Sequence, residues 1–306
     1  MDCISGEAQL FRARRVVNCA GPWCREVAED LDREVAELFR PSLAFNVLFD
    51  RPPLGPSAVA VESPVAGART YFIVPWNGKM MAGTWHQPWD GDPAATRPPS
   101  SAVEAFIDEL NLAVPGLELT LGDVRRVYAG QLPAARAGTA EASTTPVLHD
   151  HGRHGGPRGL VSVSGVKWTT ARDVVRQALL MTHGNLPDAR DDAPPRPLEP
   201  ERLSDMGWAP DRPDELLALC KRLVEEESVV WLDDLLLRRM EGLDSDAALT
   251  AAVDAGLRVM QGRGIPAEKH LARLVGSLES RYDKSAGALG SGPLTDPTAD
   301  PGESSW

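Results

Sequence analysis

Two stretches of sequence decide the fold: RVVNCAGPW at residues 15–23 and LVSVSGVKWTTAR at residues 160–172. Each begins with a run rich in valine, which favours a strand, and passes through a glycine into residues that favour a helix. Pro22 suits the first turn of a helix, because its fixed φ and its missing N–H are tolerated there. Each stretch therefore predicts a strand, a tight glycine turn and a helix.

Glycine turns of this kind have two interpretations. The N–H groups at the start of the following helix attract an anion, and glycine allows a ligand to approach the backbone closely. A single glycine before a helix is also common in ordinary connections of an α/β sheet, so spacing alone favours a purely structural role.

Apolar patterns elsewhere predict a mixed α/β (α+β) fold. Alternating or short apolar runs predict strands over residues 15–20, 43–49, 58–61, 70–74, 79–84, 124–129, 145–148 and 160–164. Helical spacing predicts helices over residues 23–38, 100–113, 169–182, 215–227, 229–240, 246–261 and 267–282. The last four helices follow a segment rich in Pro, Asp and Arg, so a small all-helical domain is expected after it.

Four regions are therefore expected along the chain. They are a mixed α/β domain at 1–187, a linker at 188–213, a C-terminal helical domain at 214–285 and a disordered tail at 286–306. The tail is assigned from its content of Gly, Pro, Ser and Asp, which cannot bury enough apolar surface to fold.

The composition is that of an ordinary globular protein. The 306 residues include 42% hydrophobic and 25% charged residues, and the net charge is 32 − 44 = −12. An acidic chain is a poor general partner for nucleic acid or for an anionic membrane. The four cysteines, at positions 3, 19, 24 and 220, form no disulfide or zinc pattern, which favours a reducing cytoplasm. No apolar stretch reaches about 18 residues, and residues 1–7 lack the pattern of a signal peptide.

Five motifs resemble those of FAD-dependent glycerol-3-phosphate dehydrogenases, and they occur in the order of that family. The matching segments are NCAGPW (18–23), PWNG with GT and DGDP (75–78, 83–84 and 90–93), YAGQLP (128–133), SGVKWTTAR (164–172) and WLDDLLLRR (231–239). The resemblance implies an FAD-dependent oxidoreductase. Its first region would be part of an FAD-binding domain with an antiparallel substrate-domain sheet.

The resemblance also implies that FAD lies near the two glycine turns. The implied cofactor-binding residues are Ala20, Gly21, Trp23, Gly165, Val166, Lys167, Trp168, Thr169 and Thr170. Lys167 would be a cation beside the flavin and the substrate, whereas without the resemblance it is a solvated turn lysine. Trp23 is also a candidate core residue, and either threonine is also a candidate helix cap.

The catalytic residues that the resemblance implies are Lys167, Gln131 and His86. The implied reaction is oxidation of glycerol 3-phosphate to dihydroxyacetone phosphate by hydride transfer to flavin, with a quinone or oxygen as the electron acceptor. His86 stands where the family has an aspartate, and it would be a general base or else a surface residue. Gln131 would offer the substrate a polar group.

The substrate side departs from the family pattern. Leu132 replaces an arginine, no arginine stands at 142–144, and Asn46 replaces a histidine. Leucine cannot bind a phosphate as arginine does, so another small alcohol, a hydroxy acid or an amine is an alternative substrate. Arg136, close in sequence, is a candidate replacement for the arginine.

The dinucleotide-binding half of the family is not recognised in the chain. No GxGxxG motif follows an opening strand, and residues 2–7 resemble the middle of the family's first domain. Three explanations stay open: an internal start, a separate FAD-binding chain, or a remnant. The second would make this chain a partner-dependent subunit that is inactive alone. The expected location is the cytoplasm, with peripheral contact at the inner membrane face as an alternative.

Three histidines, His149, His151 and His154, share a Gly-rich loop and raise the question of a metal site. The loop has no regular periodicity that would make the three side chains converge, so no metal is expected. Trp85 and Trp89 are candidates either for a pocket wall or for the core.

Overall fold

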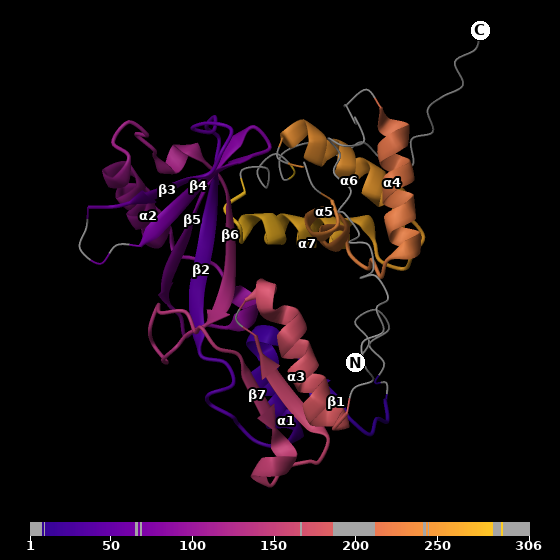
Figure 1. Cartoon of the computed structure of the whole chain (residues 1–306). Coiled ribbons are helices and arrows are strands. Elements are labelled where there is room, and N and C mark those ends of the chain that lie inside the picture. The colour runs from indigo at the N-terminus through magenta and orange to yellow at the C-terminus, as the bar shows by residue number, and fades with distance from the viewer. Residues whose placement is uncertain are drawn as a thin grey trace.

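The computed structural model describes residues 8, 10–64, 67, 69–165, 167–185, 212–240, 243, 245–283 and 289. Val166, nearly all of the expected linker and nearly all of the expected tail lie outside these residues. The described part consists of a three-stranded sheet with flanking helices, a five-stranded sheet and a group of C-terminal helices (Figure 1). The expected mixed α/β fold is confirmed, and the division into four regions stays a prediction.

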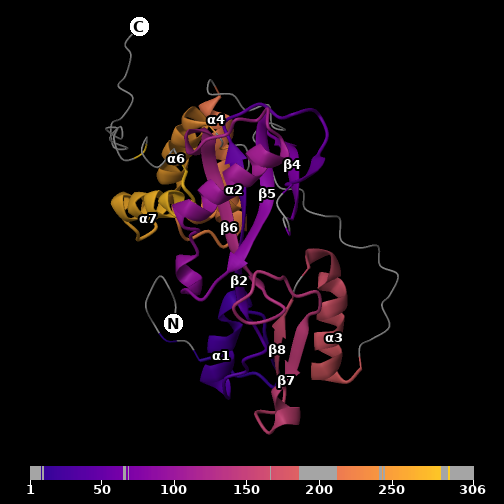
Figure 2. The same ribbon diagram turned by 90° about the vertical axis from the view of Figure 1, so that its left-hand side faces the viewer.

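The small sheet joins the two stretches that decide the fold. It has the order β1 (Val16–Asn18), β8 (Leu160–Ser164), β7 (Val147–Asp150), and its helices are α1 (Cys24–Leu31) and α3 (Ala171–His183). β1 runs parallel to β8, and β7 runs antiparallel to β8. The two helices lie on opposite faces of the sheet (Figure 2). Val161 and Val163 of β8 pack against α3, because neighbouring side chains alternate between the faces and the valines are two residues apart.

The large sheet is antiparallel throughout. Its order is β3 (Val59–Glu62), β4 (Thr70–Trp76), β5 (Lys79–Pro88), β2 (Pro41–Phe49), β6 (Val124–Pro133). Helix α2 (Ser100–Ala113) covers one face, where the ring of Phe106 meets Phe45 at 5.8 Å and Tyr71 at 5.1 Å, both edge to face. These aromatic side chains form the centre of the core of the sheet region.

The C-terminal helices have a hydrophobic core of their own. They are α4 (Pro213–Glu226), α5 (Leu232–Arg238), α6 (Asp246–Met260) and α7 (Ala267–Glu279). Pro213 begins α4, and the hydroxyl of Ser245 accepts a hydrogen bond from the N–H of Ala248 at the start of α6. The helices contact the large sheet along β6, where the N–H of Val127 donates to the carbonyl of Arg281 at 2.6 Å.

The first helix is shorter than its apolar spacing predicts. We expected a helix to residue 38, but α1 ends at Leu31, and Asp32 leaves helical geometry with φ −150°. The Asp32 carboxylate accepts a hydrogen bond from the ring of His151, 2.9 Å away. Val35 and Leu38 are still buried, so their spacing reflects burial of a loop and not a helix. The expected helix at 229–240 also begins late, at Leu232.

Candidate functional site

The two glycine turns lie side by side. Val17 pairs with Val161 and Asn18 with Ser162 in parallel register, so the carboxyl ends of β1 and β8 meet at one edge of the small sheet. After β1 the chain enters the 3₁₀ turn η1 (Gly21–Trp23), in which Gly21 has φ +59°. After β8 it enters the 3₁₀ turn η5 (Trp168–Thr170). In open α/β sheets this edge is the usual place for a ligand.

Asn18 holds the first turn in place. Its buried side-chain amide donates to the carbonyl of Cys24 at 2.8 Å and to the hydroxyl of Ser162 at 2.9 Å. Its side-chain oxygen accepts the N–H of Ala20 at 3.2 Å. One side chain therefore fixes β1, the glycine turn, the start of α1 and the neighbouring strand β8.

A buried histidine continues this polar network. The ring of His151 is fully buried, with Nε2 3.0 Å from the Ser162 hydroxyl and Nδ1 2.9 Å from the Asp32 carboxylate. The hydrogen bond from His151 lowers the pKa of Asp32. In this arrangement the ring can donate from Nδ1 to Asp32 and accept the Ser162 proton at Nε2.

The second turn is open to solvent. Gly165, Lys167, Thr169 and Thr170 are exposed, and Trp168 is 93% exposed. A Cβ atom placed on Gly21 or on Gly165 would meet no atom within 4 Å. The edge therefore leaves room for a flat ligand beside both glycines, which fits the family's cofactor.

The residues expected at the cofactor differ in the contacts that their side chains already make. Among the described residues, no hydrogen bond or ion pair engages the ammonium of Lys167. The hydroxyl of Thr170 donates to the carbonyl of Lys167 at 3.0 Å, which is a local turn contact. Trp23 is 41% exposed, so the alternative that it is a core residue is wrong. Val166 lies outside the described residues.

One face of the large sheet gathers the residues expected on the substrate side. His86 lies across from Ala44, and Leu132 lies across from Ser42, so both side chains share a face with Asn46. The side-chain oxygen of Asn46 accepts the hydroxyl proton of Thr84 at 2.9 Å.

His86 is a partly buried titratable group on this face. Its Nδ1 is buried and has no partner among the described residues. Burial, and then the positive charge of Arg69, lower the pKa of His86 below 6.5, so the ring is neutral at pH 7. The guanidinium of Arg69 donates to the carbonyl of Ala140 at 2.7 Å.

Gln131 does not share this face. It lies across from Leu43, so its side chain leaves the sheet on the side opposite to His86. Its amide donates to the hydroxyl of Thr96 at 2.8 Å, and its side-chain oxygen is buried without a partner in the described part of the chain. Gln131 instead lines a cavity of about 190 Å³ together with Pro22 and Arg25, next to the first glycine turn.

The remaining candidates from the sequence are Arg136, Trp85 and the three histidines of the Gly-rich loop. Arg136, the candidate replacement arginine, pairs with Glu141 at 3.1 Å on the surface. Trp85 packs in the core, 6.2 Å from the ring of Phe45. The rings of His149 and His154 stack at 4.3 Å, yet no group of three or more metal-ligating side chains occurs among the described residues.

Sequence reasoning missed Asn18, His151 and Asp32 as a unit. The sequence marks Asn18 only as the first residue of a motif and His151 only as a candidate metal ligand. Their contacts join segments far apart in the chain, so spacing does not reveal them. The one available indication was the polar pair Asn18 and Ser162 inside otherwise apolar strands, because buried polar side chains need partners.

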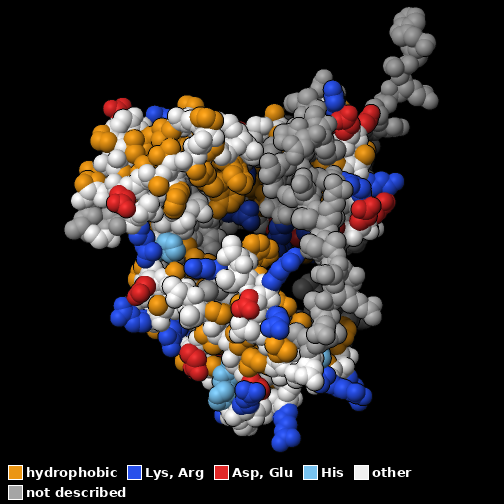
Figure 3. Space-filling view, viewed as in Figure 1, with side chains coloured by type: hydrophobic (Ala, Val, Ile, Leu, Met, Phe, Trp, Pro, Cys, Tyr) orange, Lys and Arg blue, Asp and Glu red, His pale blue; other side chains and the backbone are white. Residues whose placement is uncertain are grey.

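Lys and Arg side chains lie around the hollow between the large sheet and the small sheet with its helices (Figure 3). This local concentration contrasts with the net charge of −12 for the whole chain. An anionic ligand is attracted to such a hollow.

Comparison with known proteins identifies a family and several similar proteins. A family model described as FAD dependent oxidoreductase (DAO) matches residues 4–171. Glycerol-3-phosphate dehydrogenase of Synechocystis is 29% identical over 208 residues, covering 64% of this chain and 37% of that protein. Glycerol-3-phosphate dehydrogenase 1 of Mycobacterium tuberculosis is 30% identical over 181 residues, covering 56% of this chain and 34% of that protein. A solved glycerol-3-phosphate dehydrogenase of Bacillus halodurans, complexed with FAD, is 21% identical with a TM-score of 0.45 over 88% of this chain and 50% of that one.

The chain belongs to the DAO family of FAD-dependent oxidoreductases, because the family match covers more than half of it. FAD is the cofactor of this family, and flavin-dependent oxidation is its chemistry. The chain spans little more than a third of the length of the Synechocystis and Mycobacterium relatives. Within the described residues, no helix has both the length and the apolar character needed to cross a membrane.

Proposed function

We propose that this chain forms the substrate-facing part and the C-terminal helices of an FAD-dependent dehydrogenase that oxidises glycerol 3-phosphate or a closely similar alcohol. One observation carries the proposal: two glycine turns end neighbouring parallel strands at one sheet edge. Open space lies beside them, together with the ammonium of Lys167, which no described residue pairs with. The family membership and the names of the relatives support the reaction class. A quinone or oxygen would accept the electrons, in the cytoplasm or at the inner membrane face.

The residues at the sheet edge would hold the cofactor. FAD, when bound, accepts a hydride from a carbon that carries a hydroxyl group. Ala20, Gly21 and Gly165 would let the backbone approach it, and Thr169 would offer a hydroxyl. The ammonium of Lys167 would hold negative charge at the start of η5, where the helix end adds a favourable field of about 0.3–1 kcal/mol.

His86 is the candidate base for the substrate hydroxyl. A neutral imidazole is required for this role, and the lowered pKa of His86 provides one at pH 7. Its ring would accept the hydroxyl proton on the sheet face that it shares with Asn46. Gln131 would act from the other face, beside the first glycine turn, and would orient that turn instead of touching the same substrate atom.

A cation for an anionic substrate is available near His86. Leu132 removes the arginine that the family pattern has, and Arg136 is paired with Glu141. Arg69 lies close enough to His86 to lower the pKa of that ring. We therefore assign to Arg69 the role of binding the negative group of the substrate, which arginine does well with phosphate or carboxylate.

A second candidate function has its own observation. Val16 and Val17 of the edge strand β1 are 41% and 39% exposed, and Leu10 and Phe11 are more than four-fifths exposed. An apolar sheet edge of this kind favours pairing with another segment. The chain would then be a subunit that completes a flavin site together with a separate FAD-binding chain.

Flavin binding and reduction test both functions. We expect the purified full chain to retain FAD in equilibrium dialysis, and anaerobic glycerol 3-phosphate to bleach the absorbance of the bound flavin. Lys167→Met should slow bleaching by about a hundredfold, whereas the matched control Lys221→Met, on the exposed side of α4, should not. Flavin binding only after a dinucleotide-binding chain is added would favour the subunit. A bound flavin that no small alcohol, hydroxy acid or amine reduces would refute the enzyme.

A further inference from the structure

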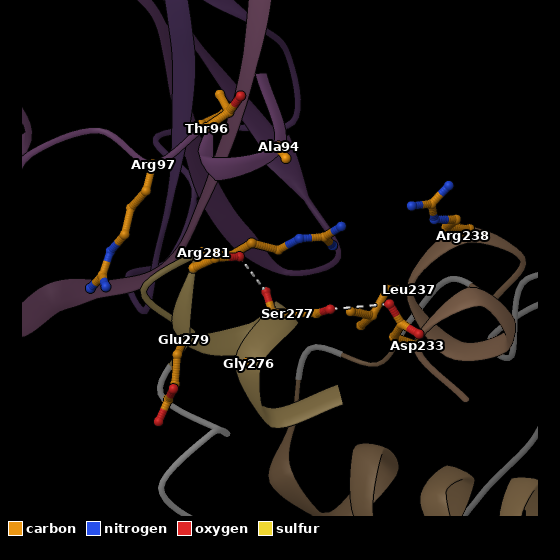
Figure 4. Close-up of a pocket in the computed structure, with 12 residues that line it drawn as sticks. Ala94, Thr96, Arg97, Asp233, Leu237, Arg238, Gly276, Ser277, Glu279 and Arg281 are labelled. Carbon is orange, nitrogen blue, oxygen red and sulfur yellow. Dashed lines mark hydrogen bonds between the residues drawn. The ribbon is translucent and has the colours of Figure 1, made fainter. Parts of the chain in front are cut away.

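A polar pocket lies between the edge of the large sheet and the C-terminal helices. Its volume is about 540 Å³, and strand β6, the segment before α2, and helices α5 and α7 line it. In Figure 4 the side chain of Arg281 runs across this pocket toward α5, the helix that carries Arg238. The carboxylate of Glu279 points away from both arginines.

Arg281 is a half-buried cation that lines the pocket. No hydrogen bond or ion pair of the described residues engages its guanidinium. Burial, and then the positive charges of Arg126 and Arg238, lower the pKa of Arg281. Tyr128 and Asp233 act in the opposite direction, and Arg126 is itself paired with Asp283. Arg238 is therefore the neighbouring cation whose repulsion an added anion would relieve.

The nearby carboxylates are already used by other groups. Asp233 accepts hydrogen bonds from Arg273 at 2.9 Å and from the hydroxyl of Ser277 at 3.1 Å. Arg238 reaches its neighbour Asp234 only at 3.9 Å, because Arg239 binds the same carboxylate oxygen at 2.5 Å. Asp234 is therefore shared between two arginines and Asp233 is already engaged, so these carboxylates offset the positive charge of Arg281 and Arg238 only in part.

Two serine hydroxyl groups in the pocket indicate which polar groups a ligand would carry besides its negative charge. Ser277 donates its proton to Asp233, and Ser280 donates its proton to the carbonyl of Ser277 at 2.8 Å. Both serines line the pocket, and their hydroxyl oxygens, which already donate, have lone pairs that can accept protons from a ligand. A ligand that matches carries a doubly charged group for the arginines and hydroxyl groups for the serines.

We propose that this pocket binds a hydroxylated phosphate monoester through Arg281 and Arg238, with ligand hydroxyl groups donating to Ser277 and Ser280. Phosphate matches two guanidinium groups in charge and in geometry, because arginine binds it through paired N–H groups. The site is built from β6, α5 and α7 and uses none of the residues assigned to flavin or to the oxidised substrate. It does not rest on the proposed function.

Calorimetric titration of the full chain tests the site with two probes, inorganic phosphate and glycerol 2-phosphate, at constant ionic strength. We expect both to bind, the glycerol ester more tightly because it adds two carbon-bound hydroxyl groups that can donate to the serines. Arg281→Gln should weaken both by about tenfold or more. Arg258→Gln, the same charge change on an exposed turn of α6, is the matched control and should bind as the unchanged chain does.

Stability measurements separate binding from folding. Without phosphate, Arg281→Gln should melt no lower than the unchanged chain, because it removes an unfavourable charge, and it should lose the rise in melting temperature that phosphate gives. Arg238→Gln, at an exposed helix end, provides the same test if the first variant does not fold. Lys167→Met should keep phosphate binding at this pocket. Absence of binding in the unchanged chain, or binding by Arg281→Gln as tight as that of the control Arg258→Gln, overturns the proposal.

Discussion

Replacement of Asn18 by alanine should uncouple the two glycine turns. The change removes two donated hydrogen bonds, to Cys24 and Ser162, and one accepted from Ala20. A net hydrogen bond contributes about 1 kcal/mol, and buried groups left without partners add to the loss, so we expect destabilisation of about 3 kcal/mol. Because the same bonds hold the turn that contains Gly21, FAD affinity should also fall, by about tenfold or more.

The matched control is Asn111→Ala. Asn111 also bonds to backbone, donating to the carbonyl of Leu119 at 2.9 Å and accepting its N–H at 2.8 Å, but it lies at the end of α2. Urea midpoints should fall for both variants, and FAD affinity in equilibrium dialysis should fall only for Asn18→Ala. If the two variants bind FAD equally well, the network does not position the turn, and the argument for a flavin edge built on Asn18 is wrong.

Three further perturbations have distinct outcomes. Gly83→Ala would put a Cβ 1.8 Å from the side-chain oxygen of Asn46. We therefore expect the free energy of unfolding to fall by about 1–3 kcal/mol, measured as a lower urea midpoint. The pKa of His270 is lowered by burial, so the unfolded chain takes up that proton first, and stability should fall as pH drops below about 6.5; His270→Phe should flatten the fall. Burial raises the pKa of Cys24 to about 11 and that of Cys220 to about 12, so both thiols should react with a disulfide reagent only on unfolding.

Each of these three predictions has a control and an outcome that would contradict it. Gly130→Ala meets no atom within 4 Å and should keep the native midpoint; equal loss in both glycine variants would deny the close contact. A pH profile of His270→Phe parallel to that of the unchanged chain would deny the role of that ring. In a Cys3→Ser background the exposed Cys19 should react first, and rapid reaction of three thiols would contradict the described burial.

Local rules predicted most of the elements because local chemistry decides them. Valine runs and glycine turns gave β1, β8 and the helices after them, and leucines at helical spacing gave α4 and α6. The end of α1 was wrong because Val35 and Leu38 are buried in a loop, and burial imitates helical spacing.

The candidate site was predicted less completely, for two physical reasons. Gln131 and Leu132 were both expected on the substrate side, although neighbours in a strand point to opposite faces, and the register puts only Leu132 on the side of His86. The contact of His151 with Asp32 joins residues 119 positions apart, and no periodicity reports such a pairing. The roles of Lys167, His86 and Gln131 stay predictions.

The hydrogen bond from Val127 to Arg281 has a consequence for solubility. β6 is the last strand of the large sheet, and ten residues of backbone would otherwise be available there for another chain to add to the sheet. The polypeptide after α7 covers part of this strand edge, so the C-terminal segment reduces the backbone that another chain could pair with. A chain cut before α4 would therefore be expected to precipitate even where its own sheet folds correctly.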